Sequence, residues 1–328
     1  MTTSTSALPT SRGGAGDPSA GLTAAIDIGG TKIAGALVHP DGSMPVTARR
    51  PTPRAVDGEG VLAAVAEVVA ELATSPLWPG VARCGIGSAG PVDASRGTVS
   101  PVNIRAWRDF PVQARVAAEL ERHGAGVPTV LVGDGVAMTA AEHWRGAARG
   151  HDNALCMVVS TGVGGGLVLG GRLHPGPTGN AGHIGHISVE VGGERCACGG
   201  RGCVEAIASG TAIARWALAQ GWTGPDRTAA GVAAAARAGE PVAVAAFDRA
   251  GRALAAAIAA TATLVETDIA VIGGGVAAAG EVLFGPVRAH LATYATLSFV
   301  TGLEIVPAQL GTDAGLIGAA AAATELLH

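Results

Sequence analysis

The apolar positions of the N-terminal part of this chain form short runs broken by glycine or aspartate, with one longer segment of helical spacing among them. Apolar residues at 22–28 and 33–38 flank the Gly29-Gly30 turn, which predicts two strands joined by a tight connection. Apolar positions from 61 to 72 recur as on the buried face of a helix. The same patterns predict a strand at 83–86, a helix at 112–122 and a strand at 129–132. This alternation indicates an α/β domain.

The second part of the chain starts the same plan again. A strand predicted at 154–160, a glycine turn at 161–166 and a strand at 167–169 repeat the arrangement at 26–37. This repeat indicates two related halves that face each other across a ligand cleft. We also expect an alanine-rich helical region at 210–265, a strand at 269–272, a turn at 273–275, a helix from 277, and a last helix at 314–327 that packs on the first half.

The length of 328 residues fits two domains. We expect a small α/β domain at 22–133, completed by the C-terminal helix 313–328, and a large α/β domain at 134–312. Residues 1–21 are rich in Ser, Thr, Gly and Pro and have neither a basic start nor an apolar stretch, so they predict a disordered tail rather than a signal peptide. A cytoplasmic location follows as an expectation.

Composition excludes several classes of protein. The longest apolar stretch, at 253–265, is much shorter than the ~20 residues that span a bilayer, so we expect no membrane contact. The net charge of −4 argues against a nucleic-acid partner. The 51 glycines lack the repeat of collagen and gather instead in short clusters between the predicted elements, as loops that approach a ligand do.

Three of these clusters could hold a nucleotide. The turn from Asp27 to Lys32, with Gly29, Gly30 and Thr31, offers backbone N–H groups, a hydroxyl and an ammonium to phosphates, and Asp27 could organise Mg²⁺. A plain β-turn with an exposed lysine is the alternative. The second cluster offers Thr161 and Gly162, with a flexible loop as the alternative. The third, with Gly274 and Gly275, follows a predicted strand but lacks the acidic ribose partner of dinucleotide-binding folds, so we assign it to adenosine.

A metal site is predicted by the spacing His186-x9-Cys196-x-Cys198-x4-Cys203. Three thiolates and one imidazole satisfy tetrahedral Zn²⁺ and leave no position for a reactive water, so this zinc would be structural. Free buried cysteines are the alternative. If zinc binds, it would fix the loop at 186–203.

These motifs together resemble those of the ROK sugar kinases, within the actin-like ATPase superfamily. The resemblance covers residues 22–326 and rests on Asp27 to Lys32, on 160–166 and on the cysteine cluster. It implies two ribonuclease-H-like domains, ATP and Mg²⁺ in the cleft between them, and transfer of phosphate to the 6-hydroxyl of a hexose. Homodimers are common in families of this kind, and we expect one here.

The resemblance also assigns the sugar site. Asp134 corresponds to the catalytic base, although Gly133 stands where the family has asparagine; capping of the following helix is the alternative role for Asp134. Asn103, His186 and Glu205 correspond to sugar ligands of the family.

His183 sets the expected substrate. Glucokinases of the family carry glutamate at this position, whereas the segment from His183 to His186 and the cysteine loop resemble bacterial N-acetylmannosamine kinases. An imidazole can donate a hydrogen bond to an acetamido carbonyl, which a carboxylate cannot do. We therefore predict an N-acetylmannosamine 6-kinase. A glucokinase or an N-acetylglucosamine kinase is the alternative, and a non-catalytic sugar-sensing or partner-binding protein is the alternative from a different class.

Overall fold

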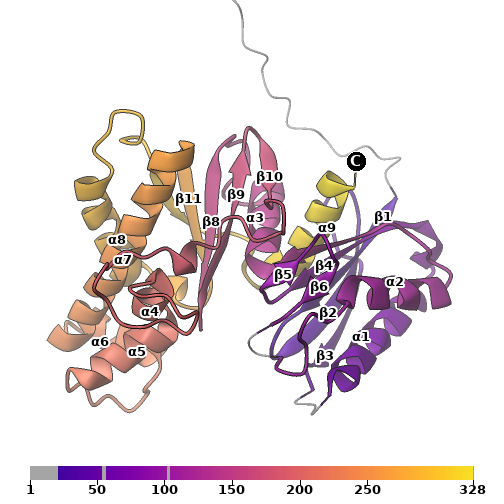
Figure 1. The fold of residues 1–328 in the computed structure, drawn as a ribbon, viewed down its shortest axis with the longest axis horizontal. Coiled ribbons are helices and arrows are strands. Elements are labelled where there is room, and N and C mark those ends of the chain that lie inside the picture. Colours follow the sequence, from indigo (N-terminus) through magenta and orange to yellow (C-terminus); the bar gives the residue numbers. More distant parts are fainter. Residues whose placement is uncertain (1–20, 54–56, 102–103, 328) are drawn as a thin grey trace, which may run out of the picture.

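The computed structural model describes residues 21–53, 57–101 and 104–327. Two five-stranded mixed sheets lie apart in the molecule, with the helices α3 and α9 between them (Figure 1). The predicted α/β class with two domains is confirmed. The exact boundaries expected for the domains remain a prediction.

The first sheet has the strand order β3-β2-β1-β4-β7. Its strands are β1 (Leu22–Ile28), β2 (Lys32–Val38), β3 (Val46–Pro51), β4 (Val81–Ser88) and β7 (Thr129–Gly133). The strands β1 and β2 form the predicted antiparallel hairpin, and β4 pairs in parallel with both β1 and β7. The carboxyl ends of β1, β4 and β7 therefore lie together at one edge, where the Asp27 turn and Asp134 follow. A short hairpin of β5 (Val92–Asp93) and β6 (Thr98–Val99) extends from this domain.

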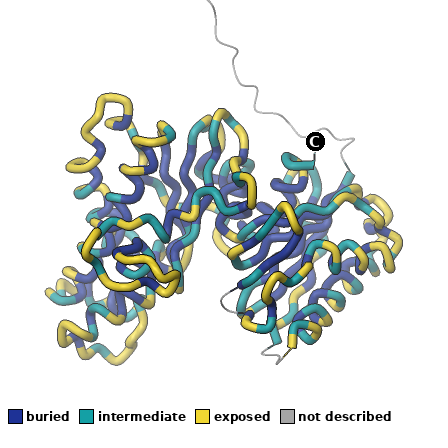
Figure 2. Tube along the Cα trace, viewed as in Figure 1, coloured by how far each residue is buried: buried dark blue, intermediate teal, exposed yellow. Residues whose placement is uncertain are grey.

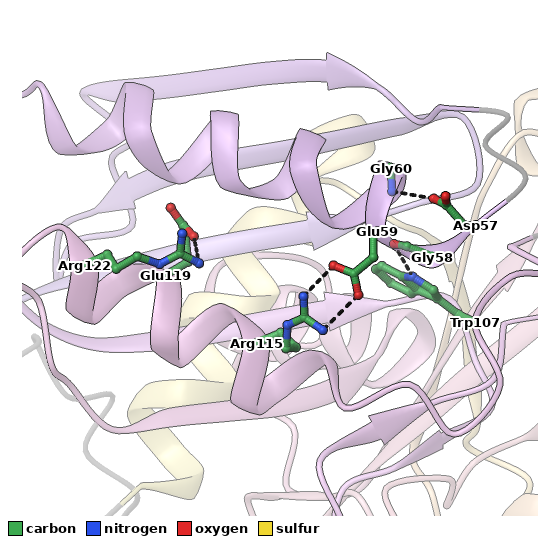
Figure 3. Close-up of polar contacts among 8 residues, drawn as sticks. All are labelled: Asp57, Gly58, Glu59, Gly60, Trp107, Arg115, Glu119 and Arg122. Atoms are coloured by element: carbon green, nitrogen blue, oxygen red, sulfur yellow. Dashed lines mark hydrogen bonds and ion pairs between the residues drawn. The ribbon is translucent and has the colours of Figure 1, made fainter.

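Helices α1 (Gly58–Ala73) and α2 (Val112–Arg122) cover one face of the first sheet (Figure 1). Figure 3 shows how they are joined: the guanidinium of Arg115 on α2 pairs with the Glu59 carboxylate on α1. Trp107 is fully buried, and its indole N–H donates to the carbonyl oxygen of Gly58 at 3.0 Å. This anchor fixes the segment between β6 and α2 to the start of α1.

The second sheet has the order β10-β9-β8-β11-β12. Its strands are β8 (Ala154–Val159), β9 (Val163–Leu169), β10 (Arg172–His174), β11 (Ile269–Gly273) and β12 (Glu304–Pro307). One face carries the largest apolar cluster, shared with the helices α4 (Val204–Ala208), α5 (Gly210–Ala219), α6 (Ala229–Arg237), α7 (Pro241–Val265) and α8 (Glu281–Tyr294). Most of the residues in both sheets are buried (Figure 2). Within the described ranges, no helix is both long and apolar enough to cross a membrane.

The two sheets are joined through α3 (Asp134–Arg145) and α9 (Ala314–Leu326). These helices pack so closely that a Cβ on Gly318 would lie 1.7 Å from the backbone oxygen of Ala137. The carboxylate of Glu142, at the end of α3, is fully buried and accepts the backbone N–H groups of Gln309 and Leu310, just before α9. One carboxylate thus ties together both chain segments that connect the domains.

The alanine-rich region at 210–265 is helical as predicted and forms three helices, because Pro225 and the Gly239-Glu240-Pro241 turn interrupt it and Thr228 and Glu240 cap the new starts. One sequence-based prediction of an element was wrong in detail. The glycines at 164–166 belong to strand β9 rather than to a turn. They serve close packing there: a Cβ on Gly135 of α3 would lie 2.5 Å from the carbonyl oxygen of Gly165.

Candidate active site

A cavity of about 300 Å³ opens between the two domains. Its walls include Asp27, Gly29 and Gly30 from the first sheet, Gly274 from the second sheet, and Asp134 from α3. Five of the residues predicted from the sequence to bind nucleotide or to act as base therefore face one space. They come from chain segments separated by more than a hundred residues, which the two-domain fold brings together.

The turn after β1 is held in place by a residue from the end of β3. The hydroxyl of Thr52 donates to the carbonyl oxygen of Gly29 at 2.6 Å, and the backbone N–H of Thr52 donates to the oxygen of Thr31 at 3.0 Å. Within the turn, Gly29 N–H donates to the oxygen of Lys32 at 2.9 Å. Thr31 is exposed and Lys32 is half-buried. The turn is consequently rigid at its base while its tip stays accessible.

Asp27 lies at the floor of this turn. Burial raises its pKa to about 6, the ammonium of Lys32 opposes this increase, and the nearby carboxylate of Asp134 adds to it. The first turn of α9 approaches Asp27 so closely that a Cβ on Gly315 would lie 2.6 Å from Oδ2. The carboxyl group is therefore confined by a helix start that carries no side chain at this point.

Asp134 is the first residue of α3, and burial raises its pKa, while the N–H of Gly135 and the imidazole of His183 lower it. Its Oδ1 accepts the N–H of Gly135 at 2.8 Å. The residue at the N-cap position is Gly133, so the alternative role of Asp134 as the cap of this helix is wrong. Gly133 itself offers no side chain to a ligand, and an added Cβ would have its nearest neighbour at 3.9 Å, the oxygen of Gly179.

The second glycine cluster forms a turn over residues 160–162. The N–H of Ser160 donates to Gly162 O at 2.8 Å, and the Thr211 hydroxyl at the start of α5 donates to Thr161 O at 3.0 Å. Glu205 reaches this turn, because its Oε2 accepts the N–H of Val163 at 2.9 Å. A residue expected at the sugar therefore also holds the end of the turn. Gly275 lies beside it, with an added Cβ 3.8 Å from the Ser160 hydroxyl oxygen.

His183 and His186 stack with their ring centroids 5.4 Å apart. Burial lowers the pKa of His183 and the neighbouring His186 lowers it further, against the opposing carboxylates of Asp134 and Glu205. The His183 imidazole is therefore neutral at neutral pH and has one N–H donor and one acceptor nitrogen. These four side chains, which the sequence assigns to the sugar, therefore lie within electrostatic reach of one another.

The four predicted metal ligands come together. Their ligand atoms lie within 4.8 Å of one another, with Sγ of Cys198 3.7 Å from Sγ of Cys203, and Sγ of Cys196 3.8 Å from Nδ1 of His186. Tetrahedral zinc with four protein ligands places its sulfur atoms about 3.8 Å apart. The cluster therefore fits zinc, and Nδ1 is the nitrogen of His186 that faces Cys196.

Asn103 is the one predicted site residue outside the described part of the chain. Sequence reasoning missed three residues that hold the site. Thr52 supports the first turn, Glu142 connects α3 to the segment before α9, and Asn180 ties the loop before His183 to the other domain. Thr52 belongs to the Arg50-Pro51-Thr52-Pro53 segment, whose two prolines at the end of a strand were the available signal.

Comparisons with known proteins agree on the family. Residues 23–325 match the model described as "ROK family". A glucokinase of Thermotoga maritima is 36% identical over 315 residues, 92% of this chain and 96% of that enzyme. An N-acetylmannosamine kinase of Yersinia pseudotuberculosis is also 36% identical, over 297 residues, 90% of this chain and 96% of that enzyme. The crystal structure of a ROK family glucokinase from Streptomyces griseus in complex with glucose and AMPPNP is 34% identical, with a TM-score of 0.75, and covers 93% of this chain and 99% of its own.

Proposed function

The chain belongs to the ROK family and is an ATP-dependent sugar kinase, and we propose that it transfers the γ-phosphate of ATP to the 6-hydroxyl of a hexose. The observation that carries this proposal is that the Asp27 turn, Gly274 and Asp134 all face one cavity. A base, a phosphate-binding turn and a nucleotide-binding turn around one space are what phosphoryl transfer to a hydroxyl requires.

Asp134 acts as the base in this proposal. Desolvation raises its pKa, which makes the carboxylate a better proton acceptor than a fully hydrated aspartate. In a loose phosphoryl-transfer transition state the proton leaves the hydroxyl late, so a carboxylate suffices as the base. Asp134 would hold the 6-hydroxyl in line with the γ-phosphate and take its proton.

The nucleotide is assigned to the turns. The N–H groups of Gly29, Gly30 and Gly162, the hydroxyls of Thr31 and Thr161, and the ammonium of Lys32 would bind phosphates, while Gly274 and Gly275 would lie against adenosine. Asp27 would hold Mg²⁺ through its water ligands, and Mg²⁺ supplies the positive charge that phosphoryl transfer needs. Zinc in the cluster of His186, Cys196, Cys198 and Cys203 would fix the loop between the sugar ligands.

Glucose is the first candidate for the hexose, because the glucokinase match extends over more residues than the match to the N-acetylmannosamine kinase at equal identity. N-acetylmannosamine is the second candidate, and His183 supports it. A neutral imidazole can donate to the acetamido carbonyl oxygen, whereas the glutamate of the family's glucokinases suits a 2-hydroxyl donor. His186, Glu205 and Asn103 would bind ring hydroxyls of either sugar. A cytoplasmic homodimer remains part of the proposal.

A coupled ADP-release assay over glucose, N-acetylmannosamine, N-acetylglucosamine and mannose tests this function. The proposal predicts hexose-dependent ADP release, with glucose or N-acetylmannosamine turned over fastest. His183→Glu is expected to shift the ratio of kcat/KM toward glucose by about tenfold or more, since it exchanges a donor for an acceptor at the 2-substituent. A hexose that raises the melting temperature without any ADP release would contradict the proposal and favour the non-catalytic sugar sensor.

A further inference from the structure

The loop that carries His183 does not stand free in the large domain. Residues 175–186, called the sugar loop below, follow β10 and cross to the small domain at the hairpin of β5 and β6. The backbone N–H of Ala94 donates to Thr178 O at 3.0 Å. An added Cβ on Gly90 would lie 3.8 Å from Cε1 of His183. The segment at 90–94 therefore lies alongside the sugar loop up to His183.

Asn180 is the centre of this contact. Its Nδ2 donates to the carbonyl oxygen of Val92 at 2.7 Å, and its Oδ1 accepts the N–H of Val92 at 3.3 Å. The amide thus matches both polar groups of one buried backbone residue, which fixes the orientation of its oxygen and nitrogen. The same Nδ2 donates to the hydroxyl oxygen of Thr178 at 3.1 Å, which holds the side chain in position within its own loop.

Gly179 makes this approach possible. It is buried at the junction with φ +86°, and an added Cβ would lie 3.0 Å from both Ala94 Cβ and Val92 Cγ2. A larger residue would be strained by its backbone conformation and would push the loop away from β5. The pairing of Asn180 therefore belongs to a junction built for close contact between the domains.

We propose that Asn180 is a positioning residue for the hexose: its amide holds the sugar loop on β5 and so sets the place of His183 relative to Asp134. The distance along the chain between Val92 and Asn180 is 88 residues, and the contact joins the two halves of the cleft on its sugar side. The predicted effect of Asn180 on catalysis rests on the proposed function. The contact between Asn180 and β5 does not, so the contact and its catalytic effect can be tested separately.

The contact is tested by hydrogen exchange on the full-length protein without substrates. Asn180→Ala is expected to speed exchange in peptides that cover Val92 and Ala94. The N–H of Val92 loses its acceptor, Asn180 Oδ1, and the N–H of Ala94 loses Thr178 O when the sugar loop is no longer held in place. Asn153→Ala is the matched control, since Asn153 also accepts a backbone N–H, that of Gly170, at the outer end of β9. Unchanged exchange at 92–94 in Asn180→Ala would overturn the proposal.

Kinetics test the consequence for the hexose. Asn180→Ala is expected to raise the KM for the hexose about tenfold, the effect of one to two lost hydrogen bonds, and to leave the KM for ATP within about twofold. Asn180→Asp is expected to be at least as severe, because a carboxylate can accept the Val92 N–H but faces the Val92 carbonyl oxygen without a donor.

Three outcomes are decisive. Equal increases in both KM values would show a general structural role and overturn the proposal. Wild-type kinetics of Asn180→Asp would overturn it as well. Absence of ADP release from the wild-type protein with every hexose would instead contradict the proposed function, and the exchange experiment would still decide whether Asn180 holds the loop.

Discussion

At the scale of single residues, two carboxyl groups face the cleft. Asp27 is half-buried, and Asp134, although exposed to the cavity, is surrounded closely enough to lose part of its hydration. Burial raises the pKa of both Asp27 and Asp134, and the charge of Asp134 raises that of Asp27 further. Two carboxylates in one cavity destabilise the ligand-free fold, because each must lose part of its hydration and each repels the other. The proposed roles, a cation site at Asp27 and a proton acceptor at Asp134, would account for their presence, since packing alone would favour neutral side chains.

Asp27 therefore predicts a gain in stability on neutralisation. Its folded pKa of about 6 lies above the ordinary value of 3.8, so the folded protein binds the proton more tightly, and this group costs stability increasingly as the pH rises from 4 to 6. Asp27→Asn is expected to raise the free energy of unfolding at pH 7.5 by up to about 3 kcal/mol without added Mg²⁺, and by less at pH 5.

Urea denaturation of both proteins at the two pH values measures this difference. Asp93→Asn serves as the control, because the pKa of that exposed carboxyl is lowered, first of all by the Ser95 hydroxyl, so its loss is not expected to stabilise the fold. If Asp27→Asn were less stable than wild type at pH 7.5, this would contradict the hypothesis that the charge of Asp27 costs stability and is kept for ligand binding.

At the scale of elements, the zinc loop connects three parts of the site. Cys203 directly precedes α4, whose second residue, Glu205, accepts the N–H of Val163 just after the turn at 160–162. His186 belongs to the candidate metal cluster and also stacks on His183. A change in the metal cluster is therefore expected to affect both His183 and the turn at 160–162.

Cys198→Ser is expected to release zinc and to raise the KM for the hexose about tenfold or more, because loss of one ligand weakens metal binding and the loop loses the support of the metal. Cys198 is the exposed ligand, so its replacement does not disturb the core. Metal content by mass spectrometry and hexose kinetics check the prediction, with Cys84→Ala, outside the cluster, as control. Wild-type kinetics in a zinc-free Cys198→Ser protein would show that the metal does not position the site.

The elements also show what could be predicted from sequence and what could not. The hairpin of β1 and β2 was predictable from two apolar runs around a glycine turn, α2 from its helical spacing of apolar positions, and α9 from a continuous alanine-rich run long enough for a helix. The glycines of β9 were misassigned to a turn, because glycine signals flexibility in sequence. Glycine is needed in β9 because α3 packs closely against it, and this reason lies in a distant element of the chain.

At the scale of the whole molecule, the site depends on segments from both ends of the chain. Its chemically distinctive residues, such as Asp27, Asp134 and the cysteine cluster, could be identified from their local motifs. Glu142 and Asn180 could not be assigned a role, because their partners lie 167 and 88 residues away and are backbone groups without a sequence pattern. The contacts that join the domains therefore could not be predicted from the sequence and become visible only in the fold.

The most direct test of the account compares wild type with Asp134→Asn in the same two measurements, ATP binding by calorimetry and hexose-dependent ADP release. The asparagine keeps the size of the side chain but cannot accept the proton of the hydroxyl. The account predicts that ATP binding is retained while kcat falls at least about 100-fold. Turnover of Asp134→Asn within a few fold of wild type would contradict the central claim that Asp134 is the base in this cleft.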